Sequence, residues 1–253
     1  MDFKRQKIAI LGVGVDDISE EAATSEILKL TKDKKGHHHV VTINPEFVML
    51  ARKDPKFLRI LRHTDLALAD GMGVVLAKLI LGGREHSRIT GVDLVKKLCN
   101  MAAKESIVVG FLGGFDGVAK EVAKRQVSKY PKLKVAIADP GNPAIGYDLK
   151  LKTKLDRIGG VDILFVAYGM GQQEFWIDRV KNRLPVGVFI GVGGAFDYLS
   201  TVKMRAPKVL QTVGFEWLWR LFMEPARFWR MRVLPIFLVL ILKAWISKKL
   251  LQN

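Results

Sequence analysis

Short apolar runs alternate with longer amphipathic segments along most of the chain. The runs have the length of buried strands, and the segments between them repeat apolar residues at helical spacing. The runs cover residues 8–13, 40–43, 66–69, 107–114, 134–138, 162–169 and 188–194. Because strands that alternate with helices form parallel sheets covered on both faces, we predict an α/β fold with a mostly parallel, doubly wound sheet.

Capping residues indicate where three of the helices begin. Asn44 and Asp54 each stand directly before a proline that opens an amphipathic segment, and Asp116 precedes the segment 117–130. Side-chain oxygens at this position accept hydrogen bonds from the first helical turn, and proline is favoured as the first helical residue. The run 8–13 leads into a glycine turn without an A-x-A cleavage site, so we expect a first strand there and no signal peptide.

Composition and charge narrow the range of partners. The 253-residue chain is 49% apolar, which is ample for a buried core, and its formal net charge is +16. This excess favours an anionic partner, which can be nucleic acid, a phosphorylated substrate or an acidic membrane surface. The single cysteine, Cys99, excludes a disulfide framework. It falls in a predicted helix over 93–104 with no histidine nearby, so we expect an inert buried thiol.

The composition changes after residue 202. Residues 203–253 hold ten Lys or Arg against two Glu, a net charge of +8, and four of the five tryptophans. We therefore divide the chain into a core, 1–202, and a C-terminal appendage, 203–253. Its apolar segment 233–246 is interrupted by Pro235 and Lys243, and it is shorter than the roughly 20 residues that a spanning helix needs. Cations and tryptophans around it favour a membrane-surface segment; the alternative is a helix docked on the core or in a dimer interface.

Two further motifs carry weak signals. Glycine-rich turns at 12–17, 113–117 and 191–197 could bring backbone N–H groups to a phosphate, but none completes G-x-G-x-x-G, since Asp17 replaces the third glycine of the first. This disfavours a nicotinamide cofactor. The triplet His37–His39 could give one ion at most two ligands, and we expect a solvated strand entry. No two aspartates stand two apart, so an Asp-x-Asp metal site is absent from the sequence.

Polar side chains follow two neighbouring predicted strands. Asp70 comes directly after 66–69, while Thr42 and Asn44 lie at the end of 40–43. Parallel sheets bind ligands at the carboxyl ends of their strands, so we expect these side chains to converge on one crevice. Asp70 and Asn44 could instead serve only as caps of the helices that follow them.

Three arginines of the appendage have a regular spacing. Arg220, Arg227 and Arg230 stand at i, i+7 and i+10, which places them on one face of a predicted helix. A guanidinium group is planar and permanently charged, so it suits a diphosphate bound without metal.

Seven motifs follow one another along nearly the whole chain. They are VVTINPEFVMLARKD (40–54), ALADGMGVV (67–75), RITGVDL (88–94), FLGGFDGVAKEVA (111–123), GMGQQEFWI (169–177), GVGGAFDYLSTVKMRAP (191–207) and FEWLWRLFMEPARFWR (215–230). Together they resemble the WecG/TagA/CpsF family of bacterial glycosyltransferases. The chain is most similar to the branch that transfers N-acetylmannosamine from its UDP derivative to undecaprenyl-diphosphate-linked N-acetylglucosamine, in the synthesis of the wall teichoic acid linkage unit.

The resemblance implies an inverting, metal-independent transferase without a cofactor, built on a Rossmann-like core. Its partners would be a UDP-sugar donor, a lipid-diphosphate-linked acceptor and an anionic membrane surface, and a homo-oligomer is compatible with it. It implies no nucleic acid partner. The appendage would complete the active site and hold the protein, as a peripheral protein, on the cytoplasmic face of the cell membrane.

The family's site residues carry over position by position. Asp70 would be the catalytic base that takes the proton of the acceptor hydroxyl. The residues that would bind substrate are Thr42, Asn44, Arg88, Gln173, Glu174, Arg220, Arg227 and Arg230. One departure is visible, because the chain has Gly171 and Gln172 where the family usually has proline and a basic residue. This leaves a choice between Gln172 and Gln173 for substrate contact, and we favour Gln173.

Three other functions compete with this interpretation. A family homologue could move another UDP sugar, such as N-acetylmannosaminuronate or glucose, because the motifs identify the core better than the sugar pocket. The basic, tryptophan-rich tail could also belong to a nucleic-acid-binding module, although the run VLPIFLVLIL favours lipid. A non-catalytic membrane scaffold is the third alternative.

Overall fold

The computed structural model describes residues 6–33, 36–212, 214–225 and 228–250, and its centre is a parallel sheet. Six strands pair in the order β4-β3-β8-β7-β5-β6, and every pairing is parallel. The strands are β3 (His38–Ile43), β4 (Leu66–Ala69), β5 (Val108–Gly113), β6 (Lys134–Asp139), β7 (Val161–Ala167) and β8 (Val186–Gly191). The prediction of a doubly wound α/β sheet is therefore confirmed.

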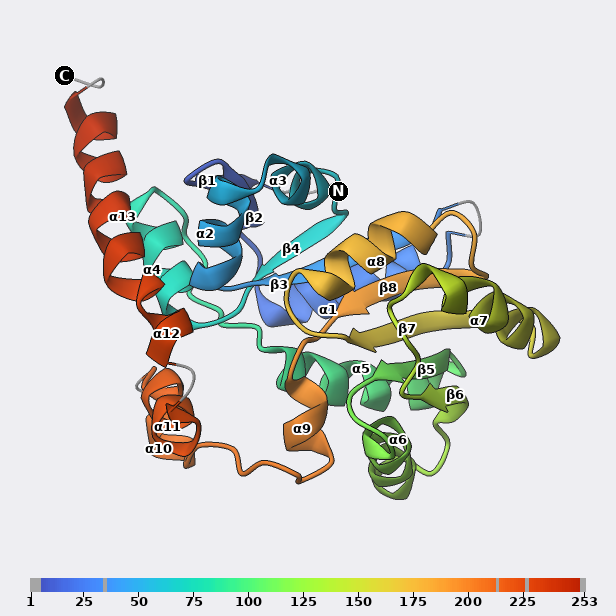
Figure 1. The fold of residues 1–253 in the computed structure, drawn as a ribbon. Coiled ribbons are helices and arrows are strands. Elements are labelled where there is room, and N and C mark those ends of the chain that lie inside the picture. The colour runs from blue at the N-terminus through green and yellow to red at the C-terminus, as the bar shows by residue number, and fades with distance from the viewer. Residues whose placement is uncertain (1–5, 34–35, 213, 226–227, 251–253) are drawn as a thin grey trace.

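Helices cover both faces of this sheet, as Figure 1 shows. Alternate strand residues point to opposite faces, so Phe165 and Ile190 pack on one side while Leu164 and Phe189 pack on the other. The first side is covered by α1 (Glu20–Leu30), α5 (Gly91–Glu105), α6 (Val118–Lys129) and α9 (Ala195–Leu199). The second is covered by α2 (Pro45–Lys53), α3 (Pro55–Arg62), α4 (Met72–Ile80), α7 (Ile145–Arg157) and α8 (Gln172–Val180).

The predicted first strand, 8–13, is wrong as a single strand of this sheet. It is split into β1 (Lys7–Ile10) and β2 (Val13–Asp16), which pair antiparallel in a separate two-stranded sheet. The two turn residues between them, Leu11 and Gly12, have φ values of +50° and +93°. Positive φ at both central residues matches the twist of a tight hairpin. The first glycine-rich turn is therefore a hairpin and does not begin a helix.

Two of the three predicted helix starts are confirmed. The Asn44 Oδ1 accepts from the N–H of Phe47 at 3.1 Å, and Asp54 caps α3 in the same way. Asp116 is not a cap, because α6 begins at Val118 after Gly117 at φ +82°, a conformation that favours glycine. Cys99 is buried in α5, as expected, and burial raises the pKa of its thiol.

The C-terminal part of the described chain is helical. Its helices are α10 (Lys208–Thr212), α11 (Glu216–Met223), α12 (Phe228–Met231) and α13 (Val233–Leu250). Pro235 does not interrupt α13, because first-turn N–H groups have no partner inside a helix. Phe237 and Ile241 are buried against the core cluster that α2 and α4 help to form, so α13 is docked on the core. No helix in the described ranges is both long and apolar enough to cross a membrane.

Candidate active site

Polar groups from three strands meet at the carboxyl edge of the sheet. Thr42 of β3 pairs in register with Leu68 of β4, two residues before Asp70. The buried Thr42 hydroxyl donates to the carbonyl oxygen of Gly191, the last residue of β8, at 3.2 Å. The backbone N–H of Asp70 donates to the carbonyl of Ile43 at 2.7 Å. The sequence prediction that Asp70 and Thr42 lie at neighbouring strand ends is confirmed.

Asp70 is half-buried at the point where β4 turns into α4. The N-cap residue of α4 is Gly71, with φ +92°, so Asp70 stands one position before the cap. A left-handed φ of this size favours glycine over any residue with a Cβ. The alternative in which Asp70 is itself the N-cap of the following helix is therefore wrong.

Asn44 does have the structural role that we left open for it. Its side-chain oxygen caps α2 through Phe47, and Pro45 occupies the first helical position. The cap fixes the half-buried side chain at the same edge of the sheet as Thr42. A further role in substrate binding stays a prediction.

Gln173 and Glu174 form a buried pair at the start of α8. The Gln173 amide donates to Glu174 Oε1 at 2.7 Å, and its own oxygen accepts from the N–H of Gly193 at 3.0 Å. Glu174 Oε2 accepts from the N–H of Gly171 at 2.7 Å. The pair therefore joins the turn before α8 to the turn after β8. Burial raises the pKa of Glu174 to about 7, although the two hydrogen bonds favour its ionised form.

The departure from the family pattern before this pair has a structural consequence. Gly171 has φ +82°, a value that proline cannot adopt because its ring fixes φ near about −65°. The turn before α8 therefore has a backbone that a proline-containing turn could not share. Gln172 is exposed, whereas Gln173 is buried, and the choice between them as the substrate contact stays a prediction.

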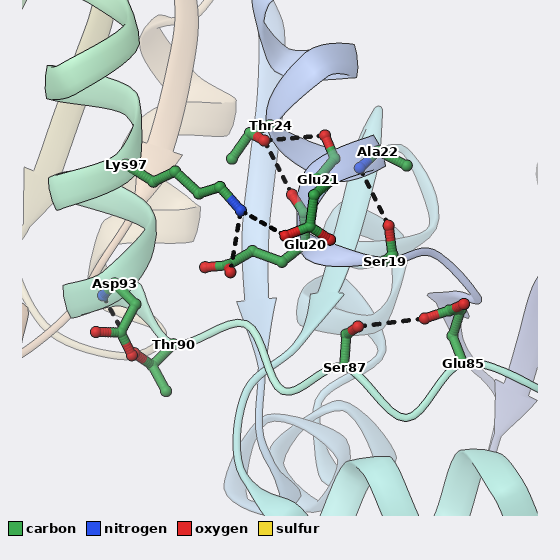
Figure 2. A network of polar contacts seen from close by, with 10 residues as sticks. All are labelled: Ser19, Glu20, Glu21, Ala22, Thr24, Glu85, Ser87, Thr90, Asp93 and Lys97. Carbon is green, nitrogen blue, oxygen red and sulfur yellow. Dashed lines mark hydrogen bonds and ion pairs between the residues drawn. The ribbon is translucent and has the colours of Figure 1, made fainter. Parts of the chain in front are cut away.

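Arg88 lies in the loop between α4 and α5, and backbone contacts fix this loop. The N–H of Ile89 donates to the carbonyl of Ala69 at 2.8 Å, which places Arg88 beside the strand end that carries Asp70. Figure 2 shows the loop from Glu85 and Ser87 running into α5, where Thr90 caps the helix through Asp93.

Asp17 stands where a phosphate-binding loop would have its third glycine. In the structure it anchors the other end of the loop between α4 and α5. Its carboxylate accepts from the N–H groups of Arg84 at 2.7 Å and Glu85 at 3.0 Å, and it pairs with the buried Lys78 at 3.1 Å. Burial alone would raise the pKa of Asp17, but these hydrogen bonds and the Lys78 charge hold it below its ordinary value.

The predicted single helix face for the three tail arginines is wrong. Helix α11, which contains Arg220, ends at Met223, and Arg230 lies in α12. Pro225, between them, cannot continue a helical hydrogen-bond ladder. The side chain of Arg220 and the whole of Arg227 lie outside the described residues.

Arg230 does reach the carboxyl edge of the sheet. Its Nε and Nη2 atoms contact Glu46 Oε2 at 2.9 Å and 2.5 Å, and Glu46 lies two residues after Asn44 at the start of α2. The Arg230 side chain is 51% exposed, so part of it faces solvent at this edge.

Sequence reasoning missed the residues that join the appendage to this edge. Glu216 at the start of α11 contacts Arg88 Nη1 and Arg205 Nε, each at 3.4 Å. Arg205 also holds Asp93 with two bonds of 2.6 Å and 2.7 Å. Burial alone would raise the pKa of Asp93, but Arg205 holds it below its ordinary value. Membership in the family motifs was the only signal for these residues, because no local pattern links positions so far apart.

The histidine triplet lies at the opposite, amino edge of the sheet, and the expected solvated entry holds for His37, which is exposed, but not for His39. His39 is buried, and within the described chain neither of its ring nitrogens has a hydrogen-bond partner. Burial lowers its pKa to about 3, so the ring is neutral. His38 contacts Asp65 at 2.8 Å and Asp33 at 3.2 Å. The described residues contain no group of three His, Cys, Asp or Glu side chains placed to hold a metal ion.

Comparison with known proteins agrees with the resemblance. The model of the glycosyl transferase WecG/TagA/CpsF family matches residues 8–250. The chain is 33% identical over 217 residues to the N-acetylglucosaminyldiphosphoundecaprenol N-acetyl-beta-D-mannosaminyltransferase of Bacillus subtilis (strain 168), which covers 86% of this chain and 84% of the relative. It is 30% identical over 242 residues to the protein of the same name from Staphylococcus aureus (strain MW2), covering 94% and 93%. The chain therefore belongs to the WecG/TagA/CpsF family of glycosyl transferases.

Proposed function

We propose that this chain transfers N-acetylmannosamine from its UDP derivative to N-acetylglucosaminyl-diphosphoundecaprenol, a step of wall teichoic acid linkage-unit synthesis. The names of its relatives support this reaction, because the similarity extends over most of both chains. The structural observation that carries the proposal is the convergence of Asp70, Thr42 and Arg88 at the ends of β3 and β4. This is the edge at which open parallel sheets bind nucleotides.

In this mechanism Asp70 is the general base. Its carboxylate takes the proton from the acceptor hydroxyl while the hydroxyl oxygen attacks the anomeric carbon from the face opposite UDP. The bond from the anomeric carbon to the diphosphate oxygen breaks, and UDP leaves with its electron pair, so the configuration is inverted. Asp70 is half-buried at a strand end, so part of its surface is open to a substrate.

Arginines take the role that a divalent ion has in other sugar-nucleotide enzymes. Arg88 and Arg230 lie at the edge that carries Asp70 and Asn44. The family resemblance adds Arg220 and Arg227 to the proposed diphosphate-binding groups. Fixed cations aimed at the leaving diphosphate stabilise the charge that develops in the transition state. The absence of an Asp-x-Asp pair from the sequence supports a reaction that does not use the metal site of those enzymes.

The appendage, 203–253, docks the protein on an anionic membrane surface at the cytoplasmic face. On α13, the side away from α2 and α4 is apolar, with Ile236, Leu238 and Ile246 each about half-exposed. Trp229 on α12 is 70% exposed. Apolar residues and tryptophans bordered by cations suit the boundary between headgroups and acyl chains. A second copy of the chain is the other occupant that this face would suit.

A donor screen tests the proposed reaction. The purified chain is mixed with a soluble lipid-diphosphate acceptor ending in N-acetylglucosamine and, separately, with UDP derivatives of N-acetylmannosamine, N-acetylmannosaminuronate, N-acetylglucosamine and glucose. We expect acceptor-dependent release of UDP with N-acetylmannosamine. Faster release with the uronate or glucose would instead identify a homologue with another donor, and no release with any donor would contradict transferase function.

A further inference from the structure

Glu216 lies between two arginines at the boundary of the core and the appendage. Its Oε2 atom is 3.4 Å from Arg88 Nη1, and its Oε1 atom is 3.4 Å from Arg205 Nε. The Glu216 side chain is 7% exposed and both arginine side chains are 16% exposed. Screening by water is weak at such a site, so these charges restrict one another's positions more than a surface pair would.

Arg205 is itself fixed to the core. It holds both carboxylate oxygens of Asp93, and Asp93 is fixed in turn by the cap that Thr90 makes at the start of α5. A two-bond contact between a guanidinium group and a carboxylate sets orientation as well as distance. The Glu216 carboxylate is therefore held by a rigid core element and does not depend on α11 alone.

The chain just before α11 packs against α4, at the carboxyl edge of the sheet. A Cβ atom on Gly214, two residues before Glu216, would lie 2.5 Å from Met72 Cγ, and Met72 is the first residue of α4. A side chain at position 214 would have to displace Met72, and the φ of +82° at Gly214 also favours glycine. Helix α11 thus begins two residues after Gly214, where the chain touches α4, the helix that follows Asp70.

From this geometry we infer that Glu216 is a positioning residue for the transfer reaction. It orients the Arg88 guanidinium at the strand end beside Asp70, where Arg88 meets the diphosphate of the donor. The position of α11 therefore affects how well the core binds and activates the donor. This inference rests on the proposed function, because it needs Arg88 as a diphosphate-binding group. Among the described residues, one Arg88 nitrogen contacts Glu216, and a guanidinium group has five N–H donors, so others remain for the diphosphate.

The other end of α11 offers a matched control. Lys203 contacts Asp197 of the core at 2.8 Å and Glu224, one residue after α11, at 3.1 Å. This contact also joins α11 to the core, but it does not involve Arg88. Glu224→Gln therefore measures the loss of a tether that does not involve Arg88, whereas Glu216→Gln measures the loss of a tether and of Arg88 orientation.

The test is a double-mutant cycle on kcat/KM for the donor, with a soluble acceptor. We expect Glu216→Gln to lower kcat/KM about tenfold or more and Glu224→Gln to lower it less than about threefold. Arg88→Ala should lower it at least as much as Glu216→Gln, and the double variant should be no worse than Arg88→Ala, because both changes remove the same interaction.

Two results would overturn the inference: wild-type kcat/KM in Glu216→Gln, or an effect of Glu216→Gln that persists in full in the Arg88→Ala background. Arg205→Lys is the second variant should Glu216→Gln fail to fold, since lysine keeps the charge but cannot hold Asp93 with two bonds; its effect should also vanish without Arg88. Wild-type activity in Arg88→Ala would instead remove Arg88 from the proposed function, which is a separate failure.

Discussion

Replacing Glu174 by glutamine should change how the stability of the protein depends on pH. Burial of the Glu174 side chain raises its pKa from the ordinary value of 4.5 to about 7. A carboxyl group with a raised folded-state pKa favours the folded state at low pH, and this contribution is lost as pH rises from the unfolded to the folded pKa.

The size of the effect follows from these two pKa values. Linkage between them gives a loss of about 2.5 kcal/mol in the free energy of unfolding between about pH 5 and about pH 8. Glutamine cannot ionise, so Glu174→Gln should lack this loss. Its amide group cannot accept from both Gly171 and Gln173, so the variant should also be less stable than wild type by about 1 kcal/mol at low pH.

Urea denaturation of both proteins at several pH values checks the prediction. The difference between wild type and variant is the quantity of interest, because all other titrating groups cancel in it. We expect the wild type to lose about 2.5 kcal/mol more than Glu174→Gln across this range. Parallel pH profiles of wild type and variant would refute the claim that burial disfavours the ionised form of Glu174.

Three further predictions concern the appendage and the chemistry. Arg230→Ala should lower turnover roughly 10- to 150-fold and barely change stability, because the Arg230 side chain is half-exposed in its pair with Glu46; wild-type turnover would remove Arg230 from the site. Ile241→Ala should cost about 2–4 kcal/mol in urea unfolding, whereas the exposed Leu242→Ala should cost less than about 1; equal costs would contradict the docking of α13. EDTA should leave UDP release intact, and a loss that magnesium restores would contradict metal independence.

Much of the sheet could be predicted because its strands carry their own signal. The run at 66–69 is apolar on both faces, as buried parallel strands require, and the run at 40–43 is apolar except for Thr42; the structure has strands at both. The run at 8–13 is also apolar, but it folds as a hairpin whose turn includes Leu11 at a positive φ, which leucine rarely adopts. The apolar pattern of the sequence therefore does not predict a turn at Leu11.

The candidate site was predictable only in part. The proximity of Asp70 and Thr42 follows from parallel topology, since residues that end adjacent strands share an edge. The contacts of Glu216 with Arg88 and Arg205 follow from how α11 packs on the core, which no local pattern encodes. The burial of His39 was missed for a related reason, because three adjacent histidines look solvated until the strand is placed between β4 and β8.

Turnover of Asp70→Asn tests the central claim most directly. Asparagine keeps the shape of the side chain and leaves the N-cap at Gly71 and the backbone bond to Ile43 unchanged, so the folded state should survive. The assay is UDP release from UDP-N-acetylmannosamine with a soluble acceptor, alongside the midpoint of thermal unfolding. A general base at this position predicts a loss of roughly 10²- to 10⁴-fold in turnover with an unchanged midpoint. Near-wild-type turnover in the folded variant would contradict it.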